Sequence, residues 1–394
     1  MARPTSDDLP SALISNLLFE VELKIRGKKA ASALQESTNL NHMTFRRNGA
    51  MALVKHAEAI QTYQREVWLP KAMRAWGASE TEIVETISKL EPSGAVAFTV
   101  FAMGFRGPDV STHLAETVAL LDQADASLLR LRSIGDMQGC LAELGPDSPL
   151  GPEYCRQLDV AGIGPLSGTA PADDLHLLDW VRVRRAHMAL SLLAAIDHEM
   201  TMWRERQVND EAWTGIPRFA VLLLDPNTKG QKRQRPDDPI ARLVDLVGTM
   251  AASLESGCWP DSQPSLGEMG SRVDRSNLVD LTGERFIKKI RSGELPMTDR
   301  NFRTLVVSQL KGVIKPVPFD PLALASMLIP YLFAAHLLTK LIPRDQNGRR
   351  LVRTGWRSEY LAWWRRHAIA LNRPTERAND AVPLWLTGPG DTGA

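Results

Sequence analysis

Apolar residues recur at the three- and four-residue spacing of an α-helix through most of this chain, and tracts rich in Gly and Pro interrupt that spacing. Strand patterns, in which apolar and polar residues alternate, are few and short. A chain with this pattern can bury its apolar residues only by packing helices together, so we predict an all-α, multi-helix fold. The main helices are expected at residues 11–34, 43–76, 83–90, 112–134, 173–206, 239–256, 321–342 and 354–371.

One Gly- and Pro-rich tract divides the chain into two unequal helical parts. We expect an N-terminal helical body (1–143), a linker or long loop (144–172), a C-terminal helical domain (173–380) and a flexible tail (381–394). Hydrophobic residues make up 44% of the 394 residues, enough for a sizeable core. Two local signals are specific: Ser79 and Glu82 match a capping box, and Gly257–Gly270 has the composition of a loop.

The segment Pro321–Thr339 contains no Asp, Glu, Lys or Arg and is just long enough to cross a bilayer. Pro330 in its middle, and the absence of a second such segment, favour instead a buried pair of helices kinked at Pro330. The three cysteines are widely spaced and odd in number, as expected in a reducing compartment. We therefore expect a cytoplasmic protein that does not bind a membrane.

The charge of the last third of the chain is the strongest indication of a partner. Residues 285–377 contain 18 Lys or Arg and 6 Asp or Glu, a local net charge of 18 − 6 = +12 in a chain whose total is +1. The densest part is Arg285–Arg303. Such a concentration of cations indicates a polyanionic partner.

Within this region the sequence predicts two short helices, which together form a basic hairpin over residues 276–313. Apolar residues over Asn277–Arg291, Leu278 included, form the buried side of the first helix, and Gly293 can end it in the left-handed conformation. Thr298 is a good N-cap for the second helix. Two short helices joined by a tight turn can present one helix to a DNA major groove. The predicted contacts to phosphates or bases are Arg285, Lys288, Lys289, Arg291, Arg300, Asn301 and Arg303.

The run from Leu278 to Leu310 resembles the later part of a lambda-repressor-like (Xre-type) helix–turn–helix domain. The matching motifs are Leu-Val-Asp-Leu-Thr-Gly, Phe-Ile-Lys-Lys-Ile-Arg-Ser-Gly-Glu and Thr-Asp-Arg-Asn-Phe-Arg-Thr-Leu, over about thirty of the 394 residues. In that family the helix before the Ser-Gly turn reads DNA, so the resemblance implies a recognition helix at Glu284–Arg291. The alternative is an ordinary helical hairpin with a solvated basic face.

Two other groups of cations suit contact with nucleic acid. A polar loop contains Lys229, Lys232, Arg233 and Arg235, which either contact phosphates or are simply solvated. The helix at 354–371 places Trp363 and Trp364 among arginines. These tryptophans either stack on bases or pack in the core, and since they point in different directions at least one is expected in the core.

The sequence Asp197-His198-Glu199, with His187 on nearly the same helix face, is the one polar cluster that suggests a metal or acid–base site. Eleven residues correspond to about 16 Å of helix rise, too far for both histidines to bind one ion. No motif identifies catalytic residues, a metal site or a cofactor.

We therefore expect a non-catalytic protein that binds nucleic acid, duplex DNA in particular, as a regulator or as an accessory factor of DNA processing. Two alternatives stay open: a helical scaffold that binds an acidic protein, and an enzyme with its active site in a helical bundle. Self-association through the N-terminal helices is compatible with each of them.

Overall fold

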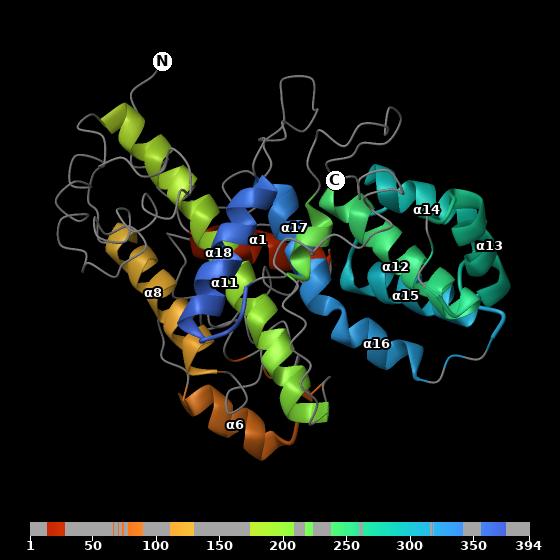
Figure 1. Ribbon diagram of the computed structural model, residues 1–394, viewed down its shortest axis with the longest axis horizontal. Helices are drawn as coiled ribbons and strands as arrows, with labels where there is room; N and C mark the ends of the chain where they lie inside the picture. The colour runs from red at the N-terminus through yellow and green to blue at the C-terminus, as the bar shows by residue number, and fades with distance from the viewer. Residues whose placement is uncertain are drawn as a thin grey trace. The chain divides into compact units, whose positions relative to one another are not determined.

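The computed structural model describes residues 14–27, 66, 70, 73–74, 78–89, 111–129, 174–208, 217–223, 238–258, 260, 263–315, 317, 319–341 and 356–375. Over these residues the protein is helical and contains no strand (Figure 1). The all-α prediction is confirmed.

Most predicted helices are present with slightly different ends. The first half of the chain contains α1 (Ile14–Arg26), α6 (Glu80–Lys89), α8 (Thr112–Leu129) and α11 (Asp174–Val208). A 3-10 turn, η6 (Phe219–Leu222), precedes α12 (Pro239–Ser256), α13 (Leu266–Ser276), α14 (Gly283–Ser292), α15 (Asp299–Lys311), α16 (Pro321–Met327), α17 (Ile329–Leu341) and α18 (Trp356–Ala370). The helix predicted at 43–76 lies almost entirely outside the described residues.

The capping box predicted at Ser79 is confirmed. The Ser79 backbone N–H donates to the Glu82 carboxylate at 2.7 Å, and the Glu82 N–H donates to Ser79 Oγ at 3.3 Å. These two bonds satisfy backbone donors that the first turn of α6 would otherwise leave unpaired.

Contacts between residues divide the chain into two compact units. Unit 1 comprises Met1–Leu23, Lys28–Trp213 and Ala362–Arg373, and unit 2 comprises Lys24–Gly27, Thr214–Leu361 and Pro374–Ala394. The long helix α11 thus belongs to unit 1, whereas the sequence grouped it with the C-terminal part. The predicted boundary at 144–172 lies outside the described residues.

In unit 1, α11 is the central helix. Every residue from His187 to Glu199 is buried, so this stretch is covered on all sides. Helix α8 packs against it and contributes Leu114 and Leu121 to the core. The middle of α18 adds two tryptophans, Trp363 and Trp364.

Unit 1 also buries a network of polar side chains. Glu199 is fully buried and accepts the backbone N–H and the hydroxyl of Ser111 at the start of α8. His367 Nδ1 lies 2.7 Å from His113 Nε2, and His367 Nε2 lies 3.0 Å from Ser191 Oγ. These contacts join α8, α11 and α18, and each gives a buried polar group a partner.

Burial disfavours protonation of two histidines in this core, His198 and His367. Burial lowers the pKa of His198 to about 4, although the ring hydrogen-bonds to the Trp364 carbonyl at 2.9 Å. The pKa of His367 is lowered well below its ordinary value, first by burial and then by His113 and His198. Protonation of these rings therefore opposes the folded state.

In unit 2, α12 is the central helix. Every residue from Pro239 to Thr249 is buried, and α14, α15, α17 and η6 pack around it. The Asp238 side chain caps its N-terminus by accepting from Ile240 N at 3.0 Å. Gly257, with φ of 80°, ends it in the left-handed region where glycine is favoured.

The apolar segment predicted as a buried helix pair kinked at Pro330 bends two residues earlier. The prediction of burial is right for α17 but wrong for α16, in which only Ala325 is buried. Helices α16 and α17 meet at Leu328 with a bend of 42°. Pro330 lies in the first turn of α17, where a missing N–H costs no helical hydrogen bond. Among the described residues, no single helix is long and apolar enough to cross a membrane, and only this bent pair passes such a test.

We expect acidification to destabilise unit 1. In the unfolded chain, His198 regains its ordinary pKa of 6.5 and binds a proton below that pH, whereas in the folded state it stays neutral down to about 4. The contribution of neutral His198 to the free energy of unfolding is therefore complete above pH 6.5 and falls as the pH drops. At pH 5 this loss is about 2 kcal/mol. Urea unfolding followed by circular dichroism at several pH values measures this loss.

The variant His198→Gln is the control, because glutamine can still donate to the Trp364 carbonyl but does not titrate. Its unfolding free energy should depend less on pH than that of the wild type. Parallel pH profiles for the two proteins would contradict the assignment.

Candidate nucleic-acid interface

Helix α13, which precedes the predicted basic hairpin, is the first element of this site. The sequence predicted a loop over Gly257–Gly270, and that prediction is wrong for Leu266–Gly270, which are helical. Ser265 and Glu268 form a capping box in which the Ser265 N–H donates to the Glu268 carboxylate at 2.6 Å and the Glu268 N–H donates to Ser265 Oγ at 3.2 Å. Asn277, with φ of 52°, ends α13.

Helix α14 crosses α13 in direct backbone contact. A Cβ atom on Gly283 would lie 2.0 Å from the Gly270 carbonyl oxygen, and one on Gly270 would lie 2.6 Å from the Glu284 nitrogen. Both positions therefore require glycine. Asp274 of α13 accepts the Gly283 N–H at 2.6 Å, so α13 also caps the N-terminus of α14.

Helix α14 is shorter than the predicted helix over Asn277–Arg291. It begins at Gly283, and Leu278 is 45% exposed in the α13–α14 connection, so its predicted place on the buried side is wrong. The reason is Thr282, whose ψ of 139° is not helical, so that it is the N-cap and α14 starts only at Gly283. The predicted end at Gly293, with φ of 79°, and the predicted N-cap at Thr298 are confirmed.

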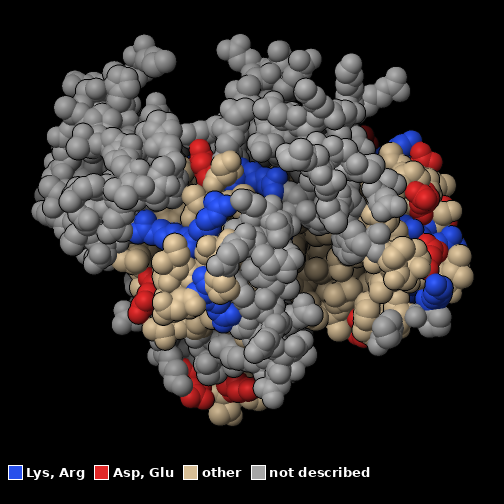
Figure 2. All heavy atoms as spheres, in the orientation of Figure 1, with Lys and Arg blue, Asp and Glu red and all other residues tan. Residues whose placement is uncertain are grey.

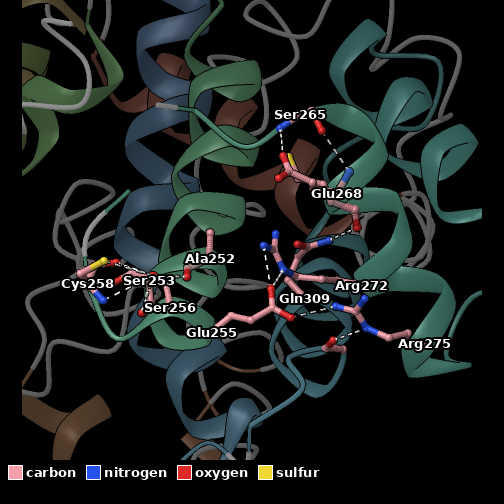
Figure 3. Close-up of polar contacts among 12 residues, drawn as sticks. Ala252, Ser253, Glu255, Ser256, Cys258, Ser265, Glu268, Arg272, Arg275 and Gln309 are labelled. Atoms are coloured by element: carbon pink, nitrogen blue, oxygen red, sulfur yellow. Dashed lines mark hydrogen bonds and ion pairs between the residues drawn. The ribbon is translucent and has the colours of Figure 1, made fainter. Parts of the chain in front are cut away.

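Ion pairs and hydrogen bonds hold α13 on α12 and α15 (Figure 3). Glu255 of α12 accepts from Arg272 at 3.0 Å and from Arg275 at 3.1 Å. Gln309 of α15 donates to the Met269 carbonyl at 2.7 Å. Arg275 also donates to the Gly312 carbonyl at 2.7 Å, beyond the end of α15. The helix pair α13–α14 therefore sits on a fixed support.

Helix α14 has one apolar and one basic face. Phe286, Ile287 and Ile290 are buried. Arg285 and Lys288 are exposed and Lys289 is half-buried, and the 100° rotation per residue places these three cations on one face, opposite the buried one. Lys288 pairs with Glu284 at 2.6 Å. Arg285 and Lys289 form no ion pair with another described residue.

Arg291 points inward instead. Its guanidinium lies 3.3 Å from the carboxylate of Asp245, which is only 2% exposed on α12. Burial raises the pKa of Asp245 to about 6, although Arg291 and Arg242 act in the opposite direction. The pair fixes the C-terminal end of α14 against α12, and Arg291 is not available to a phosphate in this arrangement.

The predicted residues of α15 are also mostly engaged. Asn301 Nδ2 donates to the Pro296 carbonyl at 2.7 Å. Arg303 donates to Asp299 at 2.8 Å and to Ser326 of α16 at 2.6 Å. Arg300 is exposed and has no ion-pair partner among the described residues. Of these three side chains, Arg300 is therefore the one available to a ligand.

The surface around the helix pair is mixed in sign. Residues 265–315 contain 10 Lys or Arg and 6 Asp or Glu, a net charge of 10 − 6 = +4. On the side of unit 2 that Figure 2 shows, acidic and basic side chains lie next to one another. Among residues 265–315, exposed cations therefore lie on α14 and at Arg300, and also at Lys311 and Lys315.

The other predicted contacts have different outcomes. Lys229, Lys232, Arg233 and Arg235 lie outside the described residues.

Trp363 and Trp364 are each 1% exposed, so neither can stack on a base without unfolding α18. Trp363 Nε1 donates to His187 at 3.1 Å, and His198 stacks on Trp364. Within the described part of the chain, no three His, Cys, Asp or Glu side chains are placed to hold a metal ion.

The residues that orient α14 were not found from the sequence. Gly270 and Gly283 are separated by thirteen positions, and no spacing rule links them. Asp274, Glu255 and Gln309 act across helices, which a helical periodicity cannot show. One signal was available: the Ser265…Glu268 spacing of a capping box predicts the start of α13.

Comparison of this chain with known protein families, with curated proteins and with solved structures finds no match. The geometry of the helix pair is therefore the basis for assigning a function.

Gly283→Ala should destabilise unit 2 by about 3 kcal/mol, because its new methyl group overlaps the Gly270 carbonyl and forces α14 away from α13. Gly267→Ala is the matched control: it lies in α13, and a Cβ there meets only Ser265 Oγ at 3.9 Å. That change should be neutral or stabilising by roughly 0.5–1 kcal/mol. Urea unfolding measures both, and equal effects would contradict the close crossing.

Glu255→Ala should increase hydrogen exchange in α13. It removes the carboxylate that pairs with Arg272, whose side chain is only 6% exposed, and leaves that guanidinium without the partner. Because Glu255 itself is 24% exposed, we expect a loss of about 2 kcal/mol in the opening free energy of α13 amides. Glu268→Ala, which removes only the capping box, should cost about 1 kcal/mol. The reverse order would contradict the supporting role of Glu255.

Proposed function

We propose that this protein binds duplex DNA through the α13–α14 helix pair, as a regulator or an accessory factor of DNA processing. The observation that favours this function most is the exposed face of α14, where Arg285, Lys288 and Lys289 lie together on a helix whose start is fixed by backbone contact with α13.

Two features of the helix pair support groove binding. In helix–turn–helix proteins the second helix enters the major groove and the first crosses the backbone. Here α14 would be the second helix, in agreement with the recognition helix that the sequence resemblance implies at Glu284–Arg291. The cross-helix bonds of Glu255, Asp274 and Gln309 give the pair a rigid support, which lowers the entropy lost on binding.

The available cations define how strongly the affinity should depend on salt. Arg285, Lys288, Lys289 and Arg300 are the predicted contacts that the structure leaves accessible. Neutralising four phosphates gives a slope of about −3.6 in a plot of log affinity against log salt concentration. The affinity should therefore fall on the order of 100-fold between about 50 mM and about 200 mM salt.

Fluorescence anisotropy with a labelled duplex tests this function. Each of Arg285→Ala and Lys289→Ala should weaken binding and reduce the magnitude of the salt slope by about 0.9. Arg74→Ala is the control, because Arg74 is an exposed cation of unit 1 that pairs with Glu80. It should bind like the wild type.

Three outcomes would overturn the proposal. The first is no binding to duplex at low salt. The second is an equal loss for Arg74→Ala and the α14 variants, which would indicate a diffuse charge effect. The third is equal or tighter binding to a single strand of the same sequence, because a single strand has no groove for α14 to enter.

A further inference from the structure

Arg291 lies at the boundary between the buried and the basic faces of α14. At 100° per residue it is about 40° from Ile287, which is buried, and about 60° from Lys288, which is exposed. Its side chain is 16% exposed, and its guanidinium points inward to Asp245 of α12. A rotation of the side chain alone would therefore move this positive charge from Asp245 to the side of α14 that carries Arg285 and Lys288.

The contact that holds Arg291 inward is not closely matched. Two guanidinium nitrogens lie 3.3 Å and 3.4 Å from the two carboxylate oxygens of Asp245. Well-formed bonds between a charged nitrogen and a carboxylate are about 2.7–2.9 Å long. Asp245 Oδ1 accepts no hydrogen bond from a described residue. The carboxylate is buried, so the attraction of Arg291 offsets only part of its lost hydration.

Arg291 is the partner that can leave this pair without the movement of a helix. The other arginine that acts on Asp245 is Arg242, which is 4% exposed and belongs to the same helix as Asp245. Helix α14 keeps its place when Arg291 leaves, because its apolar side chains remain buried and its first residue remains in contact with α13.

We propose that Asp245 is a positioning residue that withholds Arg291 from DNA, and that uptake of a proton by Asp245 releases Arg291 to the basic face of α14. The pair is thus an autoinhibitory contact, because it keeps one cation of α14 away from a ligand. Its consequence for DNA rests on the proposed function, whereas the release takes place in the free protein.

The groups that face Asp245 place its protonation near neutral pH. Arg291 of α14, Arg242 of α12 and the amide of Gln263 favour the ionised carboxyl, but burial outweighs them and raises the pKa of Asp245 to about 6. The ordinary pKa of this group, which it regains in the unfolded chain, is 3.8. Between these two values the folded protein binds a proton that the unfolded chain does not, so protonation of Asp245 favours the folded state. Release of Arg291 therefore requires no unfolding.

Nitrogen-15 NMR of the full chain without DNA tests the release. The signal of the Arg291 Nε–H, identified because Arg291→Lys removes it, should move as the pH falls from about 8 to about 5, with its midpoint near 6. Asp245→Asn cannot ionise, so in that variant the signal should keep its low-pH position throughout. The Arg303 Nε–H is the control, because it pairs with Asp299 instead and should give the same signal in both proteins.

Fluorescence anisotropy with a labelled duplex tests the consequence for DNA, at about pH 7.5, where wild-type Asp245 is ionised. Asp245→Asn should bind on the order of tenfold more tightly than the wild type at about 100 mM salt, because one more cation reaches a phosphate. The salt slope should increase in magnitude by about 0.9. Adding Arg291→Ala to Asp245→Asn should remove this gain.

An Arg291 signal that does not move with pH in the wild type, or that still moves in Asp245→Asn, would overturn the proposal. So would equal affinities of the wild type and Asp245→Asn for duplex, or a gain that survives Arg291→Ala. Circular dichroism verifies that each variant is folded. Asp245→Ala is the substitute if Asp245→Asn is not, and the wild-type titration needs no variant. Because the NMR sample contains no DNA, failure of the release and failure of DNA binding are separate results.

Discussion

The orientation of α14 depends on the contact that its first residue, Gly283, makes with the Gly270 carbonyl of α13. Neither residue has a side chain, so the two helix backbones lie in direct contact. This approach places Asp274 within reach of the Gly283 N–H, and the N-terminus of α14 is capped by the helix on which it packs. The exposed face of α14 follows from this geometry, because the contact fixes both the position and the rotation of the helix.

Many of the charged side chains near the helix pair form ion pairs with one another. Glu255 pairs with two arginines of α13, Asp245 pairs with Arg291, and Asp299 pairs with Arg303. The net charge of +12 over residues 285–377 therefore overstates the potential that a ligand would meet. Among the described residues of this range, a smaller group of cations is exposed, on α14, at the start of α15 and at Lys311 and Lys315, and acidic residues lie among the cations on the surface that Figure 2 shows.

The sequence predicts those parts of this protein that depend on neighbouring residues. The helical class, the limits of α12, the capping box at Ser79, the end of α14 at Gly293 and the N-cap at Thr298 were all predicted, since each depends on residues within one or two turns. The parts that depend on distant residues were not. Leu278 has the spacing of a buried residue, yet it lies in the connection between Asn277, which ends α13, and Thr282, the N-cap of α14. Likewise, the sequence does not show that Arg291 forms an ion pair with Asp245 of another helix whereas Arg285 is exposed.

The central position of α12 has a consequence for how unit 2 forms. The contacts of α13 with α14 and α15 join helices that follow one another in the chain, so they close short loops at low entropic cost. The contact between α12 and α17 closes a much longer loop, which contains residues 257–328. Helix α17 contributes much of the surface that covers α12. During synthesis, α12 leaves the ribosome long before α17 does. Its apolar surface is therefore open in the nascent chain, and α13 and α14 are both synthesised before the helix that closes the core beneath them.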